Sequence, residues 1–575
     1  MVEIVQISSI SFTIRRNTML AHKGIEGVIA FITPEISIDQ SLRTYSGGLG
    51  VIGGGMIGAA FRSNFPLVAV SLLYTEGYYD QGVDHHPEGR SRMTIDYPSR
   101  TYDDILEDTG VIVTVYVTGA PIHARIRRLP RGKFNTTEVL FLDVDIPEND
   151  YLSRLNGKRL YPCLETTGNS KEHNDERRVA QSIILGFGAI KALRALNYDV
   201  ALYHLNEGHA GFVPLALAQQ FQTEGNDQER TRMLVRSKVV FTTHTPVAAG
   251  NPKYPARMIN HFLSDESLQY FVNDATLDGY FDLTASSLLL SFMANGVSKK
   301  HGEVSRKMWQ GLKHGAPIIS VTNGSDPYFW QHKEYKHAET KEELAQVKRK
   351  YKRELLELVH RVTGKMWSEE ILTIVWARRF AGYKRPGLLF ADYEWIVRHL
   401  HENKLQVIMA GKPHPDDGNM INEWNNLLRK AYGLPNLVVL NGYELDLSRT
   451  LKAGADVWLN NPASPLEAAG TSGHSATMNG AINMSTPDGW YLEANEEFYF
   501  RFGLDHHRDG QDKIDGIALR KCIDERVLPM YYGDKGHWYH MALNAKLEAE
   551  EMWSSDRMLR DYVEHIYRPV LKKVV

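Results

Sequence analysis

Residues 371–385 read Ile-Leu-Thr-Ile-Val-Trp-Ala-Arg-Arg-Phe-Ala-Gly-Tyr-Lys-Arg. The run is apolar and rich in β-branched residues up to Ala377, which is typical of a buried strand in a parallel sheet. Arg378, Arg379 and Lys384 follow at once. Because open α/β sheets bind ligands beyond the carboxyl ends of their strands, this stretch predicts a strand that aims cations at an anion such as a phosphate. A helix start with ordinary surface Arg and Lys side chains is the alternative interpretation.

The same pattern recurs on both sides of this stretch. Short apolar runs alternate with helical stretches, and in the second half of the chain each run precedes a loop that carries polar residues. This alternation predicts an α/β fold with parallel sheets and crossover helices. The predicted strands are residues 67–74, 239–243, 371–377, 406–410, 437–440 and 456–459, and the predicted helices are residues 180–196, 289–302 and 341–363.

Length and composition indicate a two-domain globular protein. A chain of 575 residues exceeds one ordinary domain, and 43% apolar with 23% charged residues is typical of globular proteins. A net charge of −3 excludes an obvious nucleic-acid or membrane surface, and the basic cluster at 123–133 is interpreted as a solvated face. Two cysteines, Cys163 and Cys522, cannot form a disulfide framework, and no apolar run reaches about 18 residues. We therefore expect a cytoplasmic protein.

The domain boundary is predicted where turn signals interrupt the α/β pattern. Asn-Gly and Asp-Pro pairs with charged residues mark residues 323–343. We expect an N-terminal Rossmann-like domain at 1–325 on the acceptor side, and a C-terminal Rossmann-like domain at 326–555 on the donor and phosphate side. Residues 556–575 are expected to form a helix that returns to the first domain.

Residues 467–480 read Glu-Ala-Ala-Gly-Thr-Ser-Gly-His-Ser-Ala-Thr-Met-Asn-Gly. This segment resembles the cofactor-lysine segment of the α-glucan (glycogen/starch) phosphorylases, in which a lysine holds pyridoxal phosphate as a Schiff base. Ser475 stands at the position of that lysine. A hydroxyl cannot form an imine, so covalent pyridoxal phosphate is not expected.

The resemblance extends over nearly the whole chain, from about Val28 to Val570, and is closest to the shorter bacterial and archaeal forms. Each block alone is a weak signal, whereas the ordered set is specific. The matching blocks are 45–50, 67–74, 77–81, 204–209, 242–246, 296–302, 321–324, 378–385 and 467–480. Residues 54–58, Gly-Gly-Met-Ile-Gly, depart from the acidic and basic run usual in related short forms, which puts the leaving group or acceptor in doubt.

The resemblance implies a GT-B fold, with two facing doubly wound Rossmann-like domains, a central cleft and a C-terminal crossover helix. It also implies roles in catalysis. Arg379 and Lys384, with Arg378 beside them, would hold the reacting phosphate, and Glu467 would bind the sugar. The backbone carbonyl of His244 would favour positive charge developing at the anomeric carbon. The glycine-rich loop beside the sugar and its phosphate is Gly47, Gly48, Leu49 and Gly50.

Several further residues are predicted to contact substrate, some of them with a structural alternative. Glu207 and His209 either shape the acceptor side or form a satisfied polar network. Gly470, Thr471, Ser472 and Gly473 open a helix whose N–H groups can face a phosphate. Lys412, His414 and Tyr443 lie on loops that either meet a nucleotide or are ordinary turns.

Ser475 lies eight residues after Glu467. Nucleotide-sugar GT-B transferases often carry two glutamates with seven residues between them, and the second glutamate contacts the ribose. On this analogy, Ser475 would hydrogen-bond a ribose hydroxyl, and His474 would stack on or bond to a base. The alternative is that Ser475 caps a helix.

The sequence therefore predicts a retaining glycosyltransferase that moves a glucose-like hexose from a nucleotide-diphosphate sugar without pyridoxal phosphate. The alternatives are an α-1,4-glucan phosphorylase and an inactive glucan-binding protein. The expected partners are the sugar donor and a carbohydrate or small-molecule acceptor, with no nucleic acid and no membrane; a homodimer stays open. The pairs His85-His86 and His506-His507 lack metal-ligand spacing, so no metal is predicted.

Overall fold

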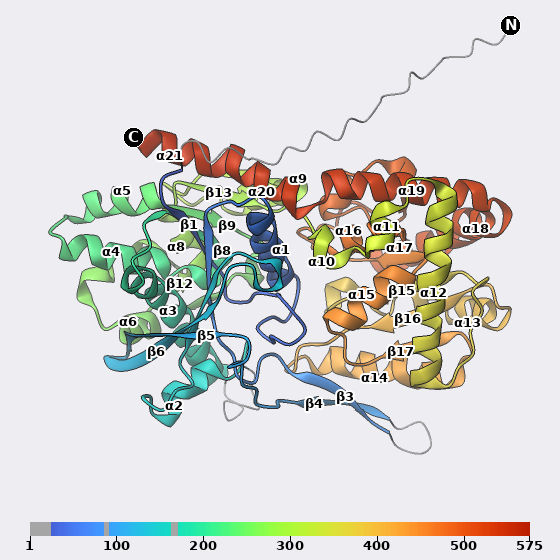
Figure 1. The fold of residues 1–575 in the computed structure, drawn as a ribbon, viewed down its shortest axis with the longest axis horizontal. Coiled ribbons are helices and arrows are strands. Elements are labelled where there is room, and N and C mark those ends of the chain that lie inside the picture. The colour runs from blue at the N-terminus through green and yellow to red at the C-terminus, as the bar shows by residue number, and fades with distance from the viewer. Residues whose placement is uncertain (1–24, 86–90, 163–170, 575) are drawn as a thin grey trace, which may run out of the picture.

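The computed structural model describes residues 25–85, 91–162 and 171–574. Within these residues the chain forms two α/β lobes, each built around its own sheet (Figure 1). The first lobe has a nine-stranded sheet and the second a six-stranded sheet. The α/β class and the parallel sheets predicted from the sequence are confirmed, whereas the residue boundaries between the domains stay predictions.

The first sheet is parallel through its centre and antiparallel at one edge. Its central strands are buried along almost their whole length because helices cover both faces, among them α1 (Gly48–Arg62) and α3 (Lys171–Ala195). In spatial order the strands are β14 (Ile318–Ser320), β13 (Met293–Gly296), β9 (Val239–Thr242), β8 (Val200–Asn206), β1 (Val28–Ile32), β2 (Leu67–Leu72), β7 (Val139–Asp143), β6 (Ala120–Leu129) and β5 (Glu107–Val117).

The second sheet contains the stretch quoted first. Strand β15 (Thr373–Ala377) lies at its centre, parallel to β16 and β18, with Ala377 opposite Ala410 and Val375 opposite Trp458. Because β16, β15 and β18 are neighbouring parallel strands, their carboxyl ends, and the polar loops that follow them, lie side by side at one edge of the sheet. The remaining strands are β16 (Gln406–Ala410), β17 (Leu437–Leu440), β18 (Val457–Asn460), β19 (Ile482–Ser485) and β20 (Phe500–Arg501).

Two of the three predicted helices are observed, and one prediction is wrong. Residues 180–196 fall almost entirely within α3, and residues 341–363 form α12 (Lys341–Thr363), which begins with a capping box between Thr340 and Glu343. Residues 289–302 instead contain strand β13 between α8 (Leu283–Leu289) and α9 (Lys299–Met308). The spacing of apolar residues in a short run does not distinguish a helix from a strand. Here the parallel pairing of β13 with β9 and β14 makes it a strand.

A hairpin of the first lobe extends across to the second lobe (Figure 1). It consists of β3 (Asp80–Asp84) and β4 (Arg92–Asp96). The Met93 amide donates to Asn425 Oδ1 at 2.8 Å, and Gln81 Nε2 donates to the Gly411 carbonyl at 3.1 Å. The hairpin therefore joins the two lobes, a contact that was not predicted.

The C-terminal helices return to the first lobe. Helix α20 (Ser555–Tyr562) continues through a π-helical segment (Val563–Tyr567) into α21 (Arg568–Val574). Tyr562 and Tyr567 are buried in the first lobe, where the Tyr567 hydroxyl lies 2.7 Å from His204 Nδ1. The chain passes between the lobes near Ser325 and again near Ser554. An isolated β-bridge pairs these two residues, so the two connecting segments lie side by side.

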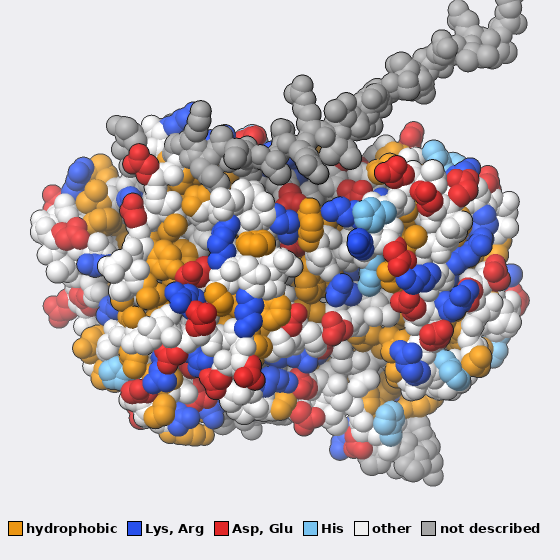
Figure 2. Space-filling view, viewed as in Figure 1, with side chains coloured by type: hydrophobic (Ala, Val, Ile, Leu, Met, Phe, Trp, Pro, Cys, Tyr) orange, Lys and Arg blue, Asp and Glu red, His pale blue; other side chains and the backbone are white. Residues whose placement is uncertain are grey.

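The outer surface carries charges of both signs. On the face shown in Figure 2, Lys and Arg side chains are interspersed with Asp and Glu. The basic cluster at 123–133 is paired in the same way, since Arg125 contacts Glu148 at 2.7 Å and Arg128 contacts Glu107 at 2.8 Å. None of the described helices has the length and apolar character needed to span a membrane.

Candidate active site

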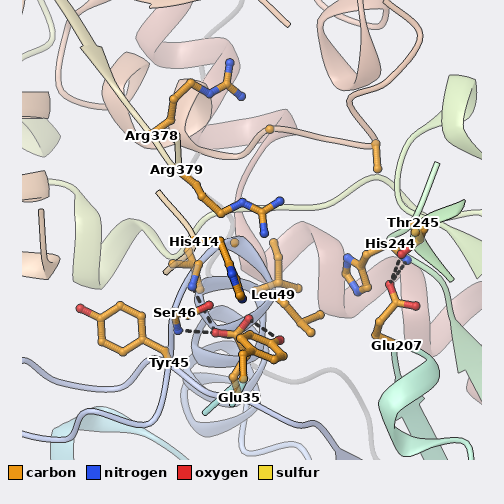
Figure 3. A pocket seen from close by; sticks show the side chains of 18 of the residues that line it. Glu35, Tyr45, Ser46, Leu49, Glu207, His244, Thr245, Arg378, Arg379 and His414 are labelled. Atoms are coloured by element: carbon orange, nitrogen blue, oxygen red, sulfur yellow. Dashed lines mark hydrogen bonds between the residues drawn. The ribbon is translucent and has the colours of Figure 1, made fainter. Parts of the chain in front are cut away.

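A cavity of about 1050 Å³ lies between the two lobes. Its wall comes largely from loops that follow strands: Glu35 after β1, His244 after β9, Arg378 after β15, Lys412 after β16 and Glu467 after β18. Figure 3 shows Arg378 and Arg379 on one side of the cavity and Glu35, Glu207 and His244 on the other. This is the position at which open α/β sheets bind ligands.

The second lobe contributes a carboxylate held by two cations. Glu467 Oε2 accepts hydrogen bonds from Arg378 Nη2 at 2.7 Å and from Lys384 Nζ at 2.9 Å. Burial alone would raise the pKa of Glu467, but Lys384 and Arg378 outweigh that effect and the pKa is lowered. Glu467 is therefore an anion that can still accept hydrogen bonds through Oε1.

Arg378 has hydrogen-bonding capacity left over. Its side chain is only 5% exposed, and its Nε and Nη1 atoms are buried without a partner among the described residues. A buried guanidinium normally has its N–H groups satisfied. Gly411 permits this placement of the strand end, because its φ of +148° and an approach of 1.9 Å between a built Cβ and the Arg378 carbonyl both exclude a side chain. These two nitrogens carry three N–H groups, which point to a bound anion.

Arg379 extends into the cavity (Figure 3). Its side chain is exposed to the cavity, and within the described part of the chain it belongs to no ion pair. Arg378, Arg379 and Lys384 thus lie together as the sequence predicts. Arg378 and Lys384 pair with Glu467, whereas Arg379 has no carboxylate partner within the described part of the chain.

Asp488 supports the same centre from behind. Its Oδ2 accepts from the Glu467 amide and its Oδ1 from the Gly489 amide, both at 2.8 Å. Burial, with a further contribution from the charge of Glu467, raises the pKa of Asp488 to about 7.

This shift predicts a pH-dependent stability that Asp488→Asn removes. Because the pKa of the folded state exceeds the value of about 3.9 expected on unfolding, the stabilising contribution is fully present at acid pH and is lost as the pH rises toward 7. Between pH 5 and 7 the free energy of unfolding of the wild type should fall by about 2 kcal/mol relative to Asp488→Asn. Urea unfolding of both proteins across this range measures the difference, and parallel curves would contradict the assignment.

The first lobe contributes the glycine-rich loop, which Glu35 holds in place. Glu35 Oε2 accepts from the amides of Ser46 at 2.5 Å and Gly47 at 3.1 Å, and its Oε1 accepts from the Tyr161 hydroxyl at 3.1 Å. Burial raises the pKa of Glu35. Glu35 is not among the predicted residues, although a glutamate three residues after a buried strand was the available signal.

Three of the four predicted loop residues line the cavity: Gly47, Gly48 and Leu49. Gly50 does not line it. Gly50 packs behind the loop, where a built Cβ would lie 2.7 Å from Tyr45 Cβ and 3.1 Å from Glu35 Oε2. Gly50 therefore permits close packing rather than ligand contact, which corrects its predicted role.

His244 is oriented by Glu207 and Asn206. The His244 amide donates to Glu207 Oε2 at 2.8 Å, and His244 Nε2 lies 2.7 Å from Asn206 Oδ1 (Figure 3 shows the contact with Glu207). Since an amide oxygen only accepts, Nε2 carries the proton and Nδ1 is left as an acceptor. Burial lowers the pKa of His244 to about 3, so the ring is neutral. A neutral imidazole here can accept a hydrogen bond from a sugar hydroxyl.

The carboxylate of Glu207 is taken up by a network of protein hydrogen bonds, which is the structural alternative given for it above. Besides the His244 amide it accepts from the Gly208 amide at 2.9 Å and the Thr245 hydroxyl at 3.2 Å. It adopts a φ of +80°, which this bonding holds in place. His209 also lines the cavity, and its buried Nδ1 has no partner among the described residues.

The predicted nucleotide loops line the cavity as well. Lys412 Nζ pairs with Glu444 and donates to the Tyr79 carbonyl at 2.7 Å, and the Tyr443 hydroxyl donates to the Ala377 carbonyl at 3.1 Å. His414 lies beside them, half-buried. Lys412 and Tyr443 thus brace the loops of the second lobe, and His414 Nδ1 accepts a hydrogen bond from the Asp416 amide at 3.1 Å.

The segment around Ser475 departs from our prediction at two residues. His474 is fully buried and does not line the cavity, because its ring stacks on Trp553 with centroids 5.5 Å apart and meets the edge of Trp490 at 4.3 Å. Gly473 also packs against Trp490. A base cannot stack on His474 in this position. The other predicted residues of the segment line the cavity: Gly470, Thr471, Ser472 and Ser475.

Ser475 does not cap a helix. It lies inside the six-residue helix α16 (Ser472–Thr477), where its hydroxyl donates back to the Ser472 carbonyl at 3.2 Å. The cap position belongs to Thr471, whose side chain makes no capping bond. Ser475 therefore presents a small side chain to the cavity at the place where the resemblance puts a lysine.

The histidine pairs show no metal site in the part of the chain that the structure describes, where no group of three or more His, Cys, Asp or Glu could hold an ion. His85 Nδ1 instead lies 3.0 Å from the Tyr432 hydroxyl, and His506 contacts Asp505. His86 and Cys163 lie outside the described residues, and Cys522 is a buried free thiol.

Comparison with known proteins places this site in a family. The profile of the carbohydrate phosphorylase family matches residues 331–523. A maltodextrin phosphorylase of Thermococcus litoralis is 30% identical over 96% of this chain and 72% of its own length. The chain belongs to the carbohydrate phosphorylase family. A glycogen phosphorylase of Aquifex aeolicus is 29% identical over 95% of this chain and 87% of its own, and an uncharacterized protein of Methanocaldococcus jannaschii is 37% identical over 94% and 99%.

The arrangement of Arg378, Arg379 and Glu467 provides the groups that a carbohydrate phosphorylase needs to bind phosphate and sugar. The cations can bind phosphate, and the carboxylate can accept hydrogen bonds from sugar hydroxyls. The nucleotide-sugar donor predicted from the sequence finds no support in these relatives, whose names favour the phosphorylase alternative.

Proposed function

We propose that this protein is an α-1,4-glucan phosphorylase that transfers a glucosyl unit between a glucan and phosphate within a GT-B arrangement of its two lobes. The observation that carries the proposal is the pair of unpartnered nitrogens on buried Arg378, beside Arg379 and Lys384. Phosphate is the dianion that such a group of cations would bind, and the names of the relatives support phosphate as co-substrate.

In the proposed reaction, an oxygen of inorganic phosphate bonds to the anomeric carbon as the glycosidic bond breaks. The departing O4 of the shortened glucan takes the proton that the phosphate carries, and glucose 1-phosphate forms. Arg379, with Lys384 beside it, holds the reacting phosphate, and Glu467 accepts hydrogen bonds from the sugar. The His244 carbonyl supports the positive charge that develops at the sugar carbon, while Glu207 keeps that residue in place.

The cavity also fits a phosphate-bearing cofactor. The orphaned nitrogens of Arg378 and the neighbouring Lys384 are suited to the phosphate of pyridoxal phosphate, and Tyr443 and Tyr45 offer ring surfaces in the same cavity. When bound, this cofactor supplies a second phosphate at the reaction centre. The residue that does not fit is Ser475, which cannot form the covalent link.

The presence of serine rather than lysine at position 475 is the single observation that favours a second candidate function. That candidate is a retaining transferase that uses a nucleotide-diphosphate hexose. With a serine in place of the lysine, the same space could receive a ribose. The buried position of His474 removes the partner that we had predicted for the base, so this candidate ranks second.

Glucose 1-phosphate release from maltodextrin and inorganic phosphate tests the proposal. We expect product to form with phosphate and not with nucleoside diphosphates, and the reverse reaction to lengthen maltodextrin from glucose 1-phosphate. Arg128→Ala, at an exposed ion pair with Glu107, is the control for substitution as such. Turnover of a nucleotide-diphosphate glucose, with no phosphorolysis whether or not pyridoxal phosphate is added, would reverse the ranking.

A further inference from the structure

Lys452 is a buried lysine of the cavity that the proposed reaction does not use. It lies on α15 (Leu445–Gly454), is 3% exposed and lines the cavity. Its Nζ lies 3.3 Å from the centre of the Trp330 ring, and it has no hydrogen-bond or ion-pair partner among the described residues. A lone buried ammonium group is costly unless the amine is neutral or meets a ligand.

The other buried lysines of the cavity wall are committed. Lys384 pairs with Glu467, and Lys412 pairs with Glu444. Among the buried lysines that line the cavity in the described chain, Lys452 alone lacks an anionic partner. Its amine is therefore the one that remains available for a ligand.

The structure ties Lys452 to the place of the missing lysine. Asn479 Nδ2 donates to the Trp330 carbonyl at 2.9 Å and also to the Ser475 carbonyl at 2.7 Å. A single side-chain amide thus joins the residue whose ring lies under Lys452 to the helix that carries Ser475. Helix α15 also packs against α16, and both Lys452 and Ser475 face the same cavity.

The surroundings of Lys452 suit a flat, aldehyde-bearing ring. Tyr45, Trp330 and Leu445 form a small apolar cluster next to it, and Ser448 lies one turn earlier on the same helix. Burial, aided by the nearby charge of Arg449, lowers the pKa of Lys452 well below its usual value. A desolvated, neutral lysine amine is the form that attacks carbonyl carbons.

We propose that Lys452 replaces the lysine absent at position 475 and forms the covalent link to pyridoxal phosphate. The Nζ lone pair bonds to the aldehyde carbon, the two amine protons leave with the aldehyde oxygen as water, and a C=N bond remains. Ser475 then leaves room for the ring instead of holding it. This inference rests on the proposed function, because it supplies the cofactor that a phosphorylase of this family would use.

Reductive trapping tests the link without relying on activity. The full-length protein is incubated with pyridoxal phosphate, dialysed, scanned for the absorbance of the C=N chromophore, reduced with borohydride and mapped by mass spectrometry. We expect the reduced adduct on the peptide that contains Lys452. Lys452→Met and Lys452→Arg should both lose it, the latter while keeping the charge, and Lys253→Met, at an exposed position of the cavity rim, should retain it.

A rescue variant separates a lost link from a lost fold. Adding Ser475→Lys to the Lys452→Met protein should return the adduct to the peptide spanning α16. An adduct on a different lysine, or none surviving dialysis, would overturn the inference. If glucose 1-phosphate forms without an adduct at Lys452, this inference alone fails. If the adduct lies at Lys452 but phosphorolysis is absent, the proposed function alone fails.

Discussion

Alanine in place of Arg379 is expected to lower kcat for phosphorolysis by about a hundredfold, because losing one donor to a developing oxyanion costs about 3 kcal/mol. The side chain extends into the cavity and is outside the ion pair around Glu467, so its removal leaves no buried carboxylate without its ion-pair partner. The melting temperature should therefore stay close to that of the wild type. Initial rates of glucose 1-phosphate release, measured beside thermal unfolding, separate the two effects.

The control for this prediction is Arg128→Ala, which also removes a guanidinium but from an exposed pair with Glu107. Such a surface pair contributes about 0–1 kcal/mol, and its loss should leave kcat unchanged. An Arg379→Ala protein that keeps a near-normal rate would show that the phosphate is held elsewhere. Arg378→Ala is a less clean probe, because it also leaves Glu467 with one partner fewer.

The fold was predictable where local pattern and burial agree. The run at 371–377 is apolar because β15 is covered on both faces, and the cations follow it because the strand ends at the cavity. Helix α12 starts at the predicted residue, where the structure shows a capping box between Thr340 and Glu343. Residues 289–302 were mistaken for a helix because the pairing that makes β13 a strand involves residues distant in sequence.

The site was predictable by type of residue but not by the direction of each side chain. His474 and Ser475 are neighbours, yet the short helix α16 turns one into a cluster with Trp490 and Trp553 and the other toward the cavity. Glu35 and Lys452 escaped notice because their significance depends on what surrounds them. A glutamate after a strand and a lysine on a helix are ordinary until their hydrogen-bond partners, or the lack of them, are known.

The largest effect on stability is expected from Glu467→Ala, which leaves Arg378 and Lys384 buried without their shared anion. Removing one partner of a buried ion pair costs about 3–5 kcal/mol. Glu467 is 13% exposed on its side chain, and Arg378 and Lys384 are 5% and 11% exposed, so water offers little compensation. Urea unfolding at constant pH measures the loss, and phosphate in the buffer should reverse part of it. An anion that binds only the folded state stabilises it by about 2.7 kcal/mol at a hundredfold excess over its Kd.

Phosphate should therefore raise the melting temperature of Glu467→Ala more than that of the wild type, since the vacated space adjoins both cations. Asp456→Ala is the matched control: it breaks the buried pair with Lys352, joined at 2.6 Å, outside the cavity wall. It should destabilise the fold to a similar degree without gaining extra stabilisation from phosphate. Equal phosphate effects in the two variants would mean that the anion acts on the protein as a whole. In that case Arg378, Arg379 and Lys384 would not form the phosphate site.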